Sequence, residues 1–318
     1  MTRFVTPIAA LFLVLVAVSA VTFVIQAGLP GNEAEIYVGR RDDLTPEQRN
    51  ALVKREEHIL GLDKPLPVQF GIWLWHAAQL DLGAQIGGGP VRPAVVRTLL
   101  PSVELAVLTL LLSLPLATLL AVSSVRRGRR LVAPIADSVT TVGFVMPQFW
   151  LGFLLVILFA VLLHWLPSGG YVSPHQSLLH HASRLIMPVI TLSVPTIALY
   201  YHFVRQSLRE ALTSQYVRTA RAKGLSESRI LYRHALPNAL LPSLTVLGIQ
   251  FGQLIGGVVI VEQVFNWPGI GGLLIYAVTN SDYNTLVGCV LAIAFAFVVF
   301  STFVEIAYRV VDPRIRRA

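Results

Sequence analysis

Residues 205–242 read RQSLREALTSQYVRTARAKGLSESRILYRHALPNALLP, a basic stretch set between two strongly apolar ones. Residues 207–216 and 216–223 favour helix by composition. Gly224 can adopt the left-handed conformation that ends a helix, and Ser226 can cap the next one. The sequence therefore predicts a helix, a tight break and a second helix, which together form a short rigid element able to move as a unit.

The composition places this element in a membrane protein. Of the 318 residues, 54% are hydrophobic and 13% are charged, whereas a soluble domain carries about 25% charged residues. A helix that crosses a bilayer needs about 20 apolar residues. Because apolar runs recur at 8–26, 99–123, 134–163, 186–204, 239–261 and 286–308, we expect an all-α membrane protein with about six transmembrane helices.

These runs divide the chain into three parts. Residues 1–26 are expected to form the first transmembrane helix, residues 27–97 an extracytoplasmic segment, and residues 98–318 a five-helix core that includes the basic loop at 205–238. Val18 and Ala20 offer an alternative, because small residues there resemble the cleavage site of a secretory signal. The first run is longer than the about 7–15 apolar residues of a cleaved signal, which favours a retained helix.

The arginines indicate the orientation of the spans. Short loops rich in arginine and lysine stay in the cytoplasm, whereas long loops translocate largely regardless of charge. With six spans, three basic groups fall on the cytoplasmic side together with both termini, and the net charge of +8 reflects topology and lipid headgroups instead of nucleic acid. These groups are Arg126, Arg127, Arg129 and Arg130; Arg205, Arg209, Arg218, Arg221, Lys223, Arg229 and Arg233; and Arg309, Arg314, Arg316 and Arg317.

The segment at 27–97 carries its own helix signal. Thr45 is expected to be an N-cap, with Pro46 at the first helical position and Gln48 three residues after the cap, which is a capping box. Trp73 and Trp75 follow, and tryptophan is enriched where membrane meets water. A surface helix is therefore predicted at 45–60, with membrane-surface packing or partner contact for the tryptophans.

Several chemistries are excluded by what the chain lacks. A phosphate-cradling loop needs a lysine directly after its glycines, and the only lysines, Lys54, Lys64 and Lys223, lie in no such motif. The single cysteine, Cys289, cannot form an internal disulfide and is expected to pack within its span. No catalytic constellation stands out, so this polypeptide is not expected to hydrolyse ATP itself.

Three histidines, His175, His180 and His181, suggest a metal site. They fall in an expected external loop without a neighbouring cysteine or acidic ligand. Ordinary surface histidines are therefore the favoured interpretation, and no metal site is predicted.

Small residues and prolines in the runs predict details of helix packing. Gly248, Gly252 and Gly256 are four residues apart, a pattern that lets helices approach closely, although lining a path is the alternative. Prolines in or beside spans are expected to bend helices inside the bundle. These prolines are Pro115, Pro147, Pro188 and Pro195.

The basic loop resembles the cytoplasmic EAA loop of the membrane subunits of ATP-binding-cassette importers, most closely that of the dipeptide, oligopeptide and nickel permease family. Glu210, Ala211 and Gly224 match the family's loop, and Leu212 departs where many relatives have a second alanine. The downstream pattern matches at 234–239, HALPNA.

The resemblance covers most of the chain. Residues 258–274, VVIVEQVFNWPGIGGLL, match the family's Glu-x-x-Phe-x-x-Pro-Gly-Ile-Gly element. Asp63, Pro65, Asp81 and Gly83 match its elements before the second span, whereas Ala84 and Gln85 replace the usual serine. The matches continue with Asp282 and Tyr283, a departure at Asn284 where proline is common, and the terminal Asp312, Pro313 and Arg314; the N-terminus departs in having only Arg3.

This resemblance implies a non-catalytic permease subunit of an ATP-driven importer in the bacterial cytoplasmic membrane, most often for di- or oligopeptides. It implies a second homologous permease subunit, two cytoplasmic ATPases that bind ATP and Mg, an extracytoplasmic solute-binding protein and no cofactor in this chain. Nickel chelates, glutathione or sugars are the alternative cargoes. The residues implied to couple the chain to the ATPases are Glu210, Ala211, Tyr216, Thr219, Ala220, Arg221, Ala222, Lys223, Gly224 and Leu225.

Polar residues near the fourth and fifth runs are candidates for the translocation path, with side-by-side packing as the alternative for each. A proton-coupled secondary transporter is the second functional hypothesis, because an intramembrane acid can mark a proton path. Glu104, Glu262 and Glu305 lie near run ends and no inverted repeat is evident, which disfavours it. The path candidates are Tyr200, Tyr201, His202, Gln206, Gln250 and Gln253.

Overall fold

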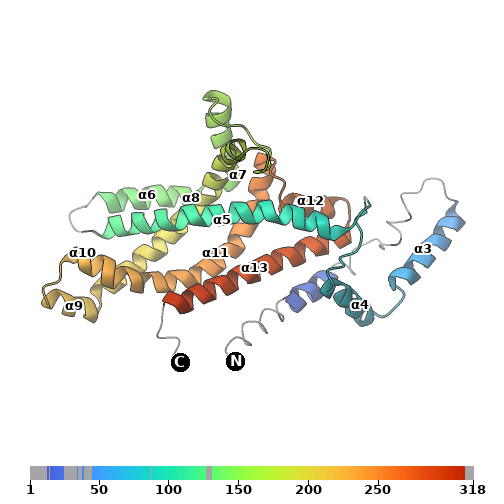
Figure 1. Cartoon of the computed structure of the whole chain (residues 1–318), viewed down its shortest axis with the longest axis horizontal. Coiled ribbons are helices and arrows are strands. Elements are labelled where there is room, and N and C mark those ends of the chain that lie inside the picture. The colour runs from blue at the N-terminus through green and yellow to red at the C-terminus, as the bar shows by residue number, and fades with distance from the viewer. Residues whose placement is uncertain are drawn as a thin grey trace. The chain divides into compact units, whose positions relative to one another are not determined.

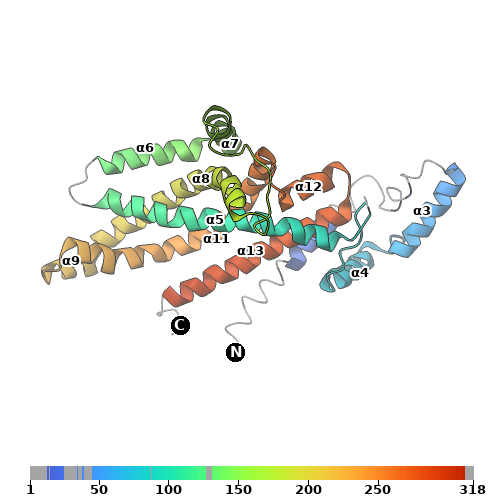
Figure 2. The same cartoon turned by 45° about the horizontal axis from the view of Figure 1, so that its top comes forward.

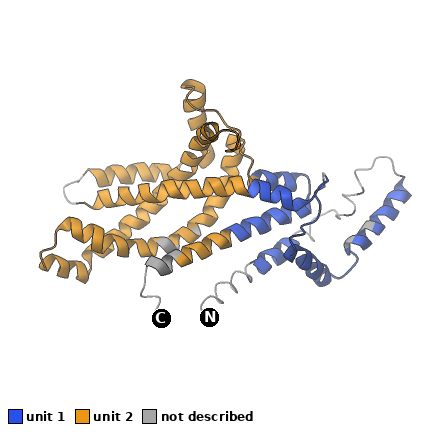
Figure 3. Ribbon diagram, viewed as in Figure 1, with its two compact units in different colours: residues 1–99, 272–296 blue, residues 100–271, 297–318 orange. Residues whose placement is uncertain are grey.

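The computed structural model describes residues 45–86, 88–126 and 131–311, together with Leu13, residues 15–24, Ala34 and Val38. In this part of the chain all regular elements are helices, apart from one isolated bridge between Ala84 and Pro90, which confirms the all-α prediction (Figures 1 and 2). The chain forms two compact units, residues 1–99 with 272–296 and residues 100–271 with 297–318 (Figure 3).

Within the described residues, four helices are long and apolar enough to cross a membrane. They are α5 (Val91–Val125), α8 (Leu178–Thr213), the part of α11 (Leu236–Phe265) from Val246 onward, and α13 (Tyr283–Val311) up to Ile306. Each of them overlaps one of the apolar runs seen in the sequence. Pro115, Pro188 and Pro195 lie inside α5 and α8 without ending them.

The third apolar run, which was predicted to be a span, forms two helical segments that meet at a bend. α6 (Val132–Val145) is followed by α7 (Gln148–Leu155) and the π-helix η1 (Val156–Leu162), with a bend of 102° between α6 and the pair that follows. Met146 is extended immediately before Pro147, because proline disfavours a helical conformation at the preceding residue. The pair is thus a broken span or a re-entrant loop, and the predicted bend at Pro147 is confirmed.

The larger unit packs around α8, which contacts α6, α7 and α11. Two buried clusters hold these helices together. One joins α5, α8 and α11 around Leu105, Leu192 and Val261; the other joins the later parts of α5 and α8 to α6 and the start of α11 around Ala117 and Tyr201. Since lipid tails are as apolar as leucine, close packing is what holds such helices together in a bilayer.

The smaller unit contains two short helices, α3 (Pro46–Leu60) and α4 (Leu66–Ala78). The predicted capping box is present: the Gln48 N–H donates to the Thr45 hydroxyl and the Thr45 N–H donates to the Gln48 side chain. On α4, Trp73 stacks against Phe70 with centroids 6.1 Å apart, whereas Trp75 is 68% exposed. The surface helix is therefore confirmed, and the two tryptophans differ in environment.

The Asp282–Tyr283 element starts α13 within this unit. The Asp282 carboxylate accepts hydrogen bonds from the Thr285 N–H and the Ile86 N–H, both at 3.1 Å. Asn284, which departs from the family pattern, donates to the Ala84 carbonyl at 3.3 Å. These residues cap the helix and hold the turn before α5 against it.

Some sequence predictions fall outside the described residues. In the first run a helix is described at Leu15–Val24, and its remainder lies outside. The same holds for Arg127, Arg129 and Arg130 and for the terminal Asp312–Arg314.

Candidate functional site

The basic stretch begins as the last turns of α8. α8 ends at Thr213, and Ser214, with an extended backbone, separates it from α9 (Gln215–Ala222). The helix predicted to reach residue 216 therefore ends earlier. The Ser214 hydroxyl donates to the Ala211 carbonyl, which satisfies one of the carbonyls that a helix end leaves without an intrahelical partner.

α9 ends in a Schellman motif at Gly224. The Leu225 N–H donates to the Ala220 carbonyl at 3.2 Å, and the Gly224 N–H donates to the Arg221 carbonyl at 2.9 Å, the two bonds that define this motif. Gly224 has φ +77°, which confirms its predicted left-handed conformation. A Cβ there would meet no atom within 4 Å, so glycine is required by the backbone conformation alone.

Beyond the break, α10 (Glu227–Arg229) leads into the π-helix η2 (Ile230–Ala235). Ser226 occupies the N-cap position, but its side chain makes no capping hydrogen bond, so the predicted cap is wrong in that detail. Arg221 instead reaches across the break and donates to Glu227 through Nε at 2.9 Å and Nη2 at 3.3 Å. This two-pronged ion pair links the last turn of α9 to α10 across the break.

The inner face of the loop is an apolar cluster. Val217 and Ile230 are fully buried and Ala220 is 8% exposed, with Leu212 and Leu225 packed against them. Leu225 follows the glycine, and its contact with the last turn of the helix is the hydrophobic partner that commonly accompanies a Schellman motif. The loop is therefore a small packed body with its own core.

The outer face of α9 is exposed and polar. Tyr216, Thr219 and Lys223 are separated by three and four residues, which places them along one side of a helix, and Tyr216 is 42% exposed. The residues expected to couple the chain to a partner differ in exposure. The exposed ones are Glu210, Tyr216, Thr219, Ala222, Lys223 and Gly224. The half-buried ones are Ala211, Arg221 and Leu225, and the one that packs inward is Ala220.

The loop is fastened to the transmembrane helices. Leu231 and Ala235 of η2 lie in the same buried cluster as Tyr201, Val204 and Leu208 of α8. The π-helix η2 and α8 therefore share one close-packed core.

Glu210 lies on α8, before the break. Its carboxylate accepts a hydrogen bond from the Gln206 side chain at 2.7 Å, one helical turn earlier. Both side chains are exposed. The Glu210 carboxylate therefore stays accessible within the basic stretch.

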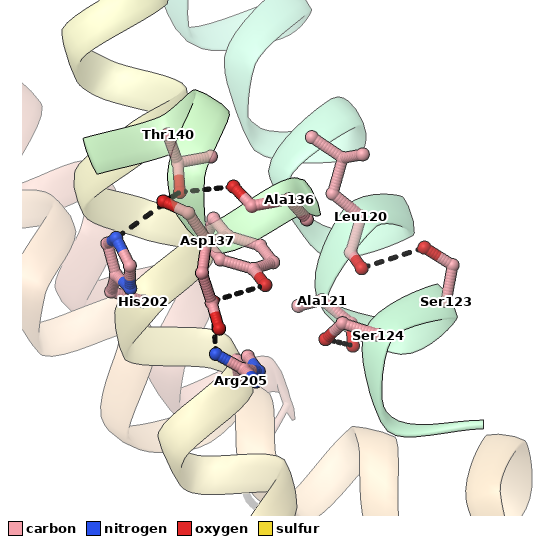
Figure 4. A network of polar contacts seen from close by, with 10 residues as sticks. Leu120, Ala121, Ser123, Ser124, Ala136, Asp137, Thr140, His202 and Arg205 are labelled. Carbon is pink, nitrogen blue, oxygen red and sulfur yellow. Dashed lines mark hydrogen bonds and ion pairs between the residues drawn. The ribbon is translucent and has the colours of Figure 1, made fainter. Parts of the chain in front are cut away.

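A polar network joins α6 to α8 (Figure 4). The Asp137 carboxylate accepts hydrogen bonds from the Tyr201 hydroxyl at 2.9 Å and from the Arg205 guanidinium. Thr140 lies 3.3 Å from His202 Nε2. Arg205 is only 9% exposed, so Asp137 is the counter-charge that allows an arginine to lie at this position.

Sequence reasoning missed Asp137. The available signal was an acid inside the apolar run at 134–163, because an ionisable residue in a span is a functional candidate whose partner should be sought. We expected the fourth span to end at residue 204 and assigned Arg205 to the cytoplasmic loop, so its pairing with Asp137 was not predicted. In the structure α8 continues to Thr213, about two turns further.

The residues proposed for the translocation path separate into two groups. Tyr200, Tyr201 and Gln250 are buried among neighbouring helices, at 3%, 0% and 8% exposure, which matches the packing alternative. His202 and Gln206 are exposed on α8, as is Gln253 on α11. The structure does not bring all six side chains to one surface.

The contacts of Glu262 explain why the Pro-Gly-Ile-Gly element lies next to this acid. Glu262 is 1% exposed, and its carboxylate accepts a hydrogen bond from the Ser102 hydroxyl and another from the Gly271 N–H at 2.8 Å. The Ser102 oxygen accepts from the Ile270 N–H at 2.8 Å. Together they satisfy the first donors of α12 (Ile270–Thr279), and the carboxylate suits the positive end of a helix dipole.

The described residues contain no cluster of three histidine, cysteine or acidic side chains that could hold a metal ion. His175 and His180 are exposed as expected. His181 is 5% exposed, so its assignment as a surface histidine was wrong. Cys289 is fully buried, as expected for a packing residue.

The three glycines of α11 that were predicted to let helices approach closely differ in their surroundings. A Cβ at Gly252 would meet Phe297 at 3.4 Å, but at Gly248 and Gly256 it would meet nothing within 4 Å. Within the part of the chain that is described, only one of the three glycines therefore serves close packing.

The chain matches two families of membrane transport components. Residues 113–317 match the family described as binding-protein-dependent transport system inner membrane component, and residues 1–86 match the N-terminal family of such membrane components. Both the basic loop at 205–238 and the Glu262 element lie inside the first match.

Individual relatives match along nearly the whole chain. A Sinorhizobium fredii protein named "probable peptide ABC transporter permease protein" is 38% identical over 304 residues, which are 95% of each chain. The glutathione transport system permease protein of Salmonella choleraesuis is 33% identical over 303 residues, 95% of this chain and 94% of its own.

Among solved structures, an amino acid ABC transporter crystallised with histidines matches with a TM-score of 0.51 at 17% identity. The match covers 68% of this chain and 94% of that one. At this identity the likeness supports the fold of the helical core and nothing about substrate.

Proposed function

Because the chain belongs to the family of binding-protein-dependent transport system inner membrane components, we propose that it forms half of a peptide translocation path and couples that path to cytoplasmic ATPases through α9. It is a multi-pass inner-membrane permease subunit of an ABC importer. The observation that carries the coupling proposal is the packed loop at 214–235, with an exposed outer face and an inner face fastened to α8.

In this proposal the packed loop at 214–235 moves as a rigid body. A partner groove that grips Tyr216, Thr219 and Lys223 displaces α9 as a body, because the Schellman motif and the Arg221–Glu227 ion pair hold its far end. Leu231 and Ala235 pass that displacement to α8. ATP-driven closure of the partner then shifts the permease between inward-facing and outward-facing states by binding one of them better.

In this proposal the Asp137–Arg205 pair lies close to the point where displacement of the loop reaches the other helices of the larger unit. It ties α6 to α8 close to the start of the loop. The pair keeps α6 and α8 moving together, so that the displacement is not lost as local bending of α8.

The partners follow from the family. Such a permease works with ATPase and binding-protein components, and we assign to this importer a second homologous permease subunit, two cytoplasmic ATPases that bind ATP and Mg, and an extracytoplasmic solute-binding protein. This chain supplies no nucleotide site in the proposal, in keeping with its lack of a phosphate-cradling lysine.

The proposed orientation keeps both termini, the loop after α5 and the α9 loop in the cytoplasm. The arginines that support it cluster at 126–130, 205–233 and 309–317, and positive residues are retained inside. Residues 45–86, with α3 and α4, then lie outside.

Short peptides are the proposed substrate. Support comes from a relative named for peptide transport at 38% identity and another named for glutathione, itself a peptide derivative. A path for varied peptides needs polar but unspecific groups, and the exposed His202, Gln206 and Gln253 are the described candidates.

The secondary-transporter hypothesis is not favoured. A relative named for an ABC transporter permease aligns over 95% of this chain. Glu262, one of the acids on which that hypothesis rested, binds Ser102 and the Gly271 N–H, a structural role at the start of α12.

The test of the substrate is mass spectrometry of the ligand that copurifies with the cognate binding protein, followed by uptake into vesicles that hold the whole complex. We expect a peptide to be recovered and to accumulate only with ATP. Recovery of a nickel chelate or a sugar, with no peptide taken up, contradicts the peptide assignment and leaves the permease role standing. Accumulation driven by a proton gradient without ATP contradicts the permease role itself.

A further inference from the structure

α4 differs from the helix before it in having no charged side chain. Its 13 residues include no aspartate, glutamate, lysine or arginine, whereas the 15 residues of α3 include six of them. A helix that is apolar around most of its circumference is stable where most of that surface is covered. α4 therefore needs apolar surroundings that α3 does not need.

One face of α4 packs against the first apolar run. The centroids of the Phe70 and Trp73 rings lie 5.4 and 6.4 Å from that of Phe23. Phe23 lies near the end of the run at 8–26, and a run of that length reaches the surface of a bilayer at its end. These contacts place α4 at the level of the membrane surface.

The opposite face of α4 is also apolar. Val68, Gly71 and Trp75 are separated by three and four residues, which places them on one side of the helix, and all three are exposed in this chain. Trp75 follows Trp73 by two residues, a rotation of about 200° around the helix. Tryptophan is enriched where lipid headgroups meet acyl chains, so the chemistry of this face fits lipid.

Charged side chains flank α4 at both ends. The Asp63 side chain, before the helix, is 44% exposed, and that of Asp81, after it, is 61% exposed. A helix of 13 residues is shorter than the about 20 residues that a crossing needs, and this length is typical of interfacial segments. Because a charge is costly inside the bilayer, both ends stay at the water side and the helix lies along the surface.

A third side of α4 is polar. Gln69 and His76 are seven residues apart, two turns along the same side of the helix. The Gln69 amide donates to two backbone carbonyls of the turn before α4, and His76 Nδ1 lies 3.2 Å from the Asp81 carboxylate. His76 follows Trp75 by one residue, so this side is rotated by about 100° from the apolar face. A polar side next to an apolar one is the pattern of a helix in the membrane interface.

We propose that α4 lies in the headgroup region of the leaflet at which the first run ends, with Val68, Gly71 and Trp75 against the acyl chains and with Gln69 and His76 toward water. Such a helix is buried about 5–10 Å into the boundary between headgroups and acyl chains. With the proposed topology this is the outer leaflet. α4 thus anchors to the membrane the segment that carries α3, and the charged α3 stays in water.

The test is electron paramagnetic resonance of spin-labelled cysteines in the whole complex, reconstituted in lipid nanodiscs in a Cys289→Ala background. Labels are attached to Val68→Cys and Trp75→Cys on the proposed lipid face. His76→Cys, the next residue along the helix, is the matched control, and Asn50→Cys on α3 is the water standard. Relaxation by oxygen, which concentrates in lipid, is compared with relaxation by water-soluble chromium oxalate, and lipids labelled on the acyl chain calibrate depth.

We expect the labels at 68 and 75 to be relaxed more by oxygen than by chromium oxalate, at a depth of about 5–10 Å, and those at 50 and 76 to show the reverse preference. Stronger relaxation by chromium oxalate at 68 and 75 puts this face in water and overturns the proposal. Low collision rates with both reagents at 68 and 75 reveal a protein partner on this face, such as another subunit or the binding protein, and overturn it as well.

The same preference for oxygen at 75 and 76 contradicts the proposed orientation of the helix. None of these readings depends on transport or on which way the chain is inserted, so their failure is separate from a failure of the proposed function.

Discussion

The Glu262 carboxylate lies 2.8 Å from the backbone nitrogen of Gly271, nine residues later in the chain. Around it, a Cβ at Gly269 would overlap the same carboxylate, and one at Gly271 would come within 2.7 Å of it. The Ser102 hydroxyl also donates to this acid, which fills the space that the glycines leave. The spacing of Glu, Gly and Gly in this element is therefore a steric and hydrogen-bonding requirement at the start of α12.

Replacing Gly269 with alanine should destabilise the permease strongly, because the added methyl group displaces Glu262 from its donors. Each buried group left without a partner costs about 1–3 kcal/mol. Gly248→Ala is the control, because a Cβ there meets no atom within 4 Å and alanine gains about 0.5–1 kcal/mol over glycine in a helix. Thermal stability of the two variants in detergent should move in opposite directions, and equal losses contradict this account of the element.

We predict that Asp137 and Arg205 contribute to the free energy of unfolding through a direct interaction. Asp137→Asn leaves Arg205 without its counter-charge, and a hydrogen bond to a charged group is worth about 1.5–3 kcal/mol. Tyr201→Phe removes one neutral donor to the same carboxylate and should cost less, about 0.5–1.5 kcal/mol. A double-mutant cycle on unfolding free energies that shows additive effects for Asp137→Asn and Arg205→Gln contradicts a direct interaction.

How far the sequence predicts this structure depends on the range of the interactions. Apolar runs, the Thr45 capping box and the left-handed Gly224 depend on neighbouring residues, and all three are as expected. The Asp137–Arg205, Glu262–Ser102 and His181–Glu104 contacts join residues 68, 160 and 77 positions apart. No local pattern predicts which distant side chains meet, so these pairs emerge only from the packing of α5, α6, α8 and α11.

The broken third span shows a second limit. The apolar run at 134–163 was long enough for one crossing, and hydropathy does not distinguish a straight helix from two that meet at 102°. Pro147 marked the position of the bend, but its size depends on what α6 and α7 pack against.

The proposed topology predicts a labelling pattern. In a Cys289→Ala background, Asn50→Cys on the exposed face of α3 should react with an impermeant thiol reagent added to intact cells. Ser226→Cys, also exposed, should react only after the membrane is opened. Labelling of position 226 in intact cells reverses the orientation.

The left-handed conformation of Gly224 is expected to matter for the coupling of ATP hydrolysis to uptake. Gly224→Val should uncouple ATP hydrolysis from uptake, because a residue with a Cβ pays roughly 1–2 kcal/mol in the left-handed region, while the protein remains in the membrane. Gly224→Asn, a residue that tolerates this conformation better, should retain more coupling. Uptake per ATP hydrolysed in proteoliposomes measures this, and equal coupling in both variants and wild type contradicts the assigned role.

The central claim, that α9 is the surface on which the ATPases act, is tested most directly by site-specific photo-crosslinking in the assembled complex. A photoreactive phenylalanine analogue is placed at Tyr216, which is 42% exposed on α9, or at Tyr276, which is 47% exposed on α12. We predict a crosslink from position 216 to the ATP-binding subunit that changes in yield when ATP is added, and none from position 276. Absence of that crosslink from position 216, or an equal one from position 276, contradicts the claim.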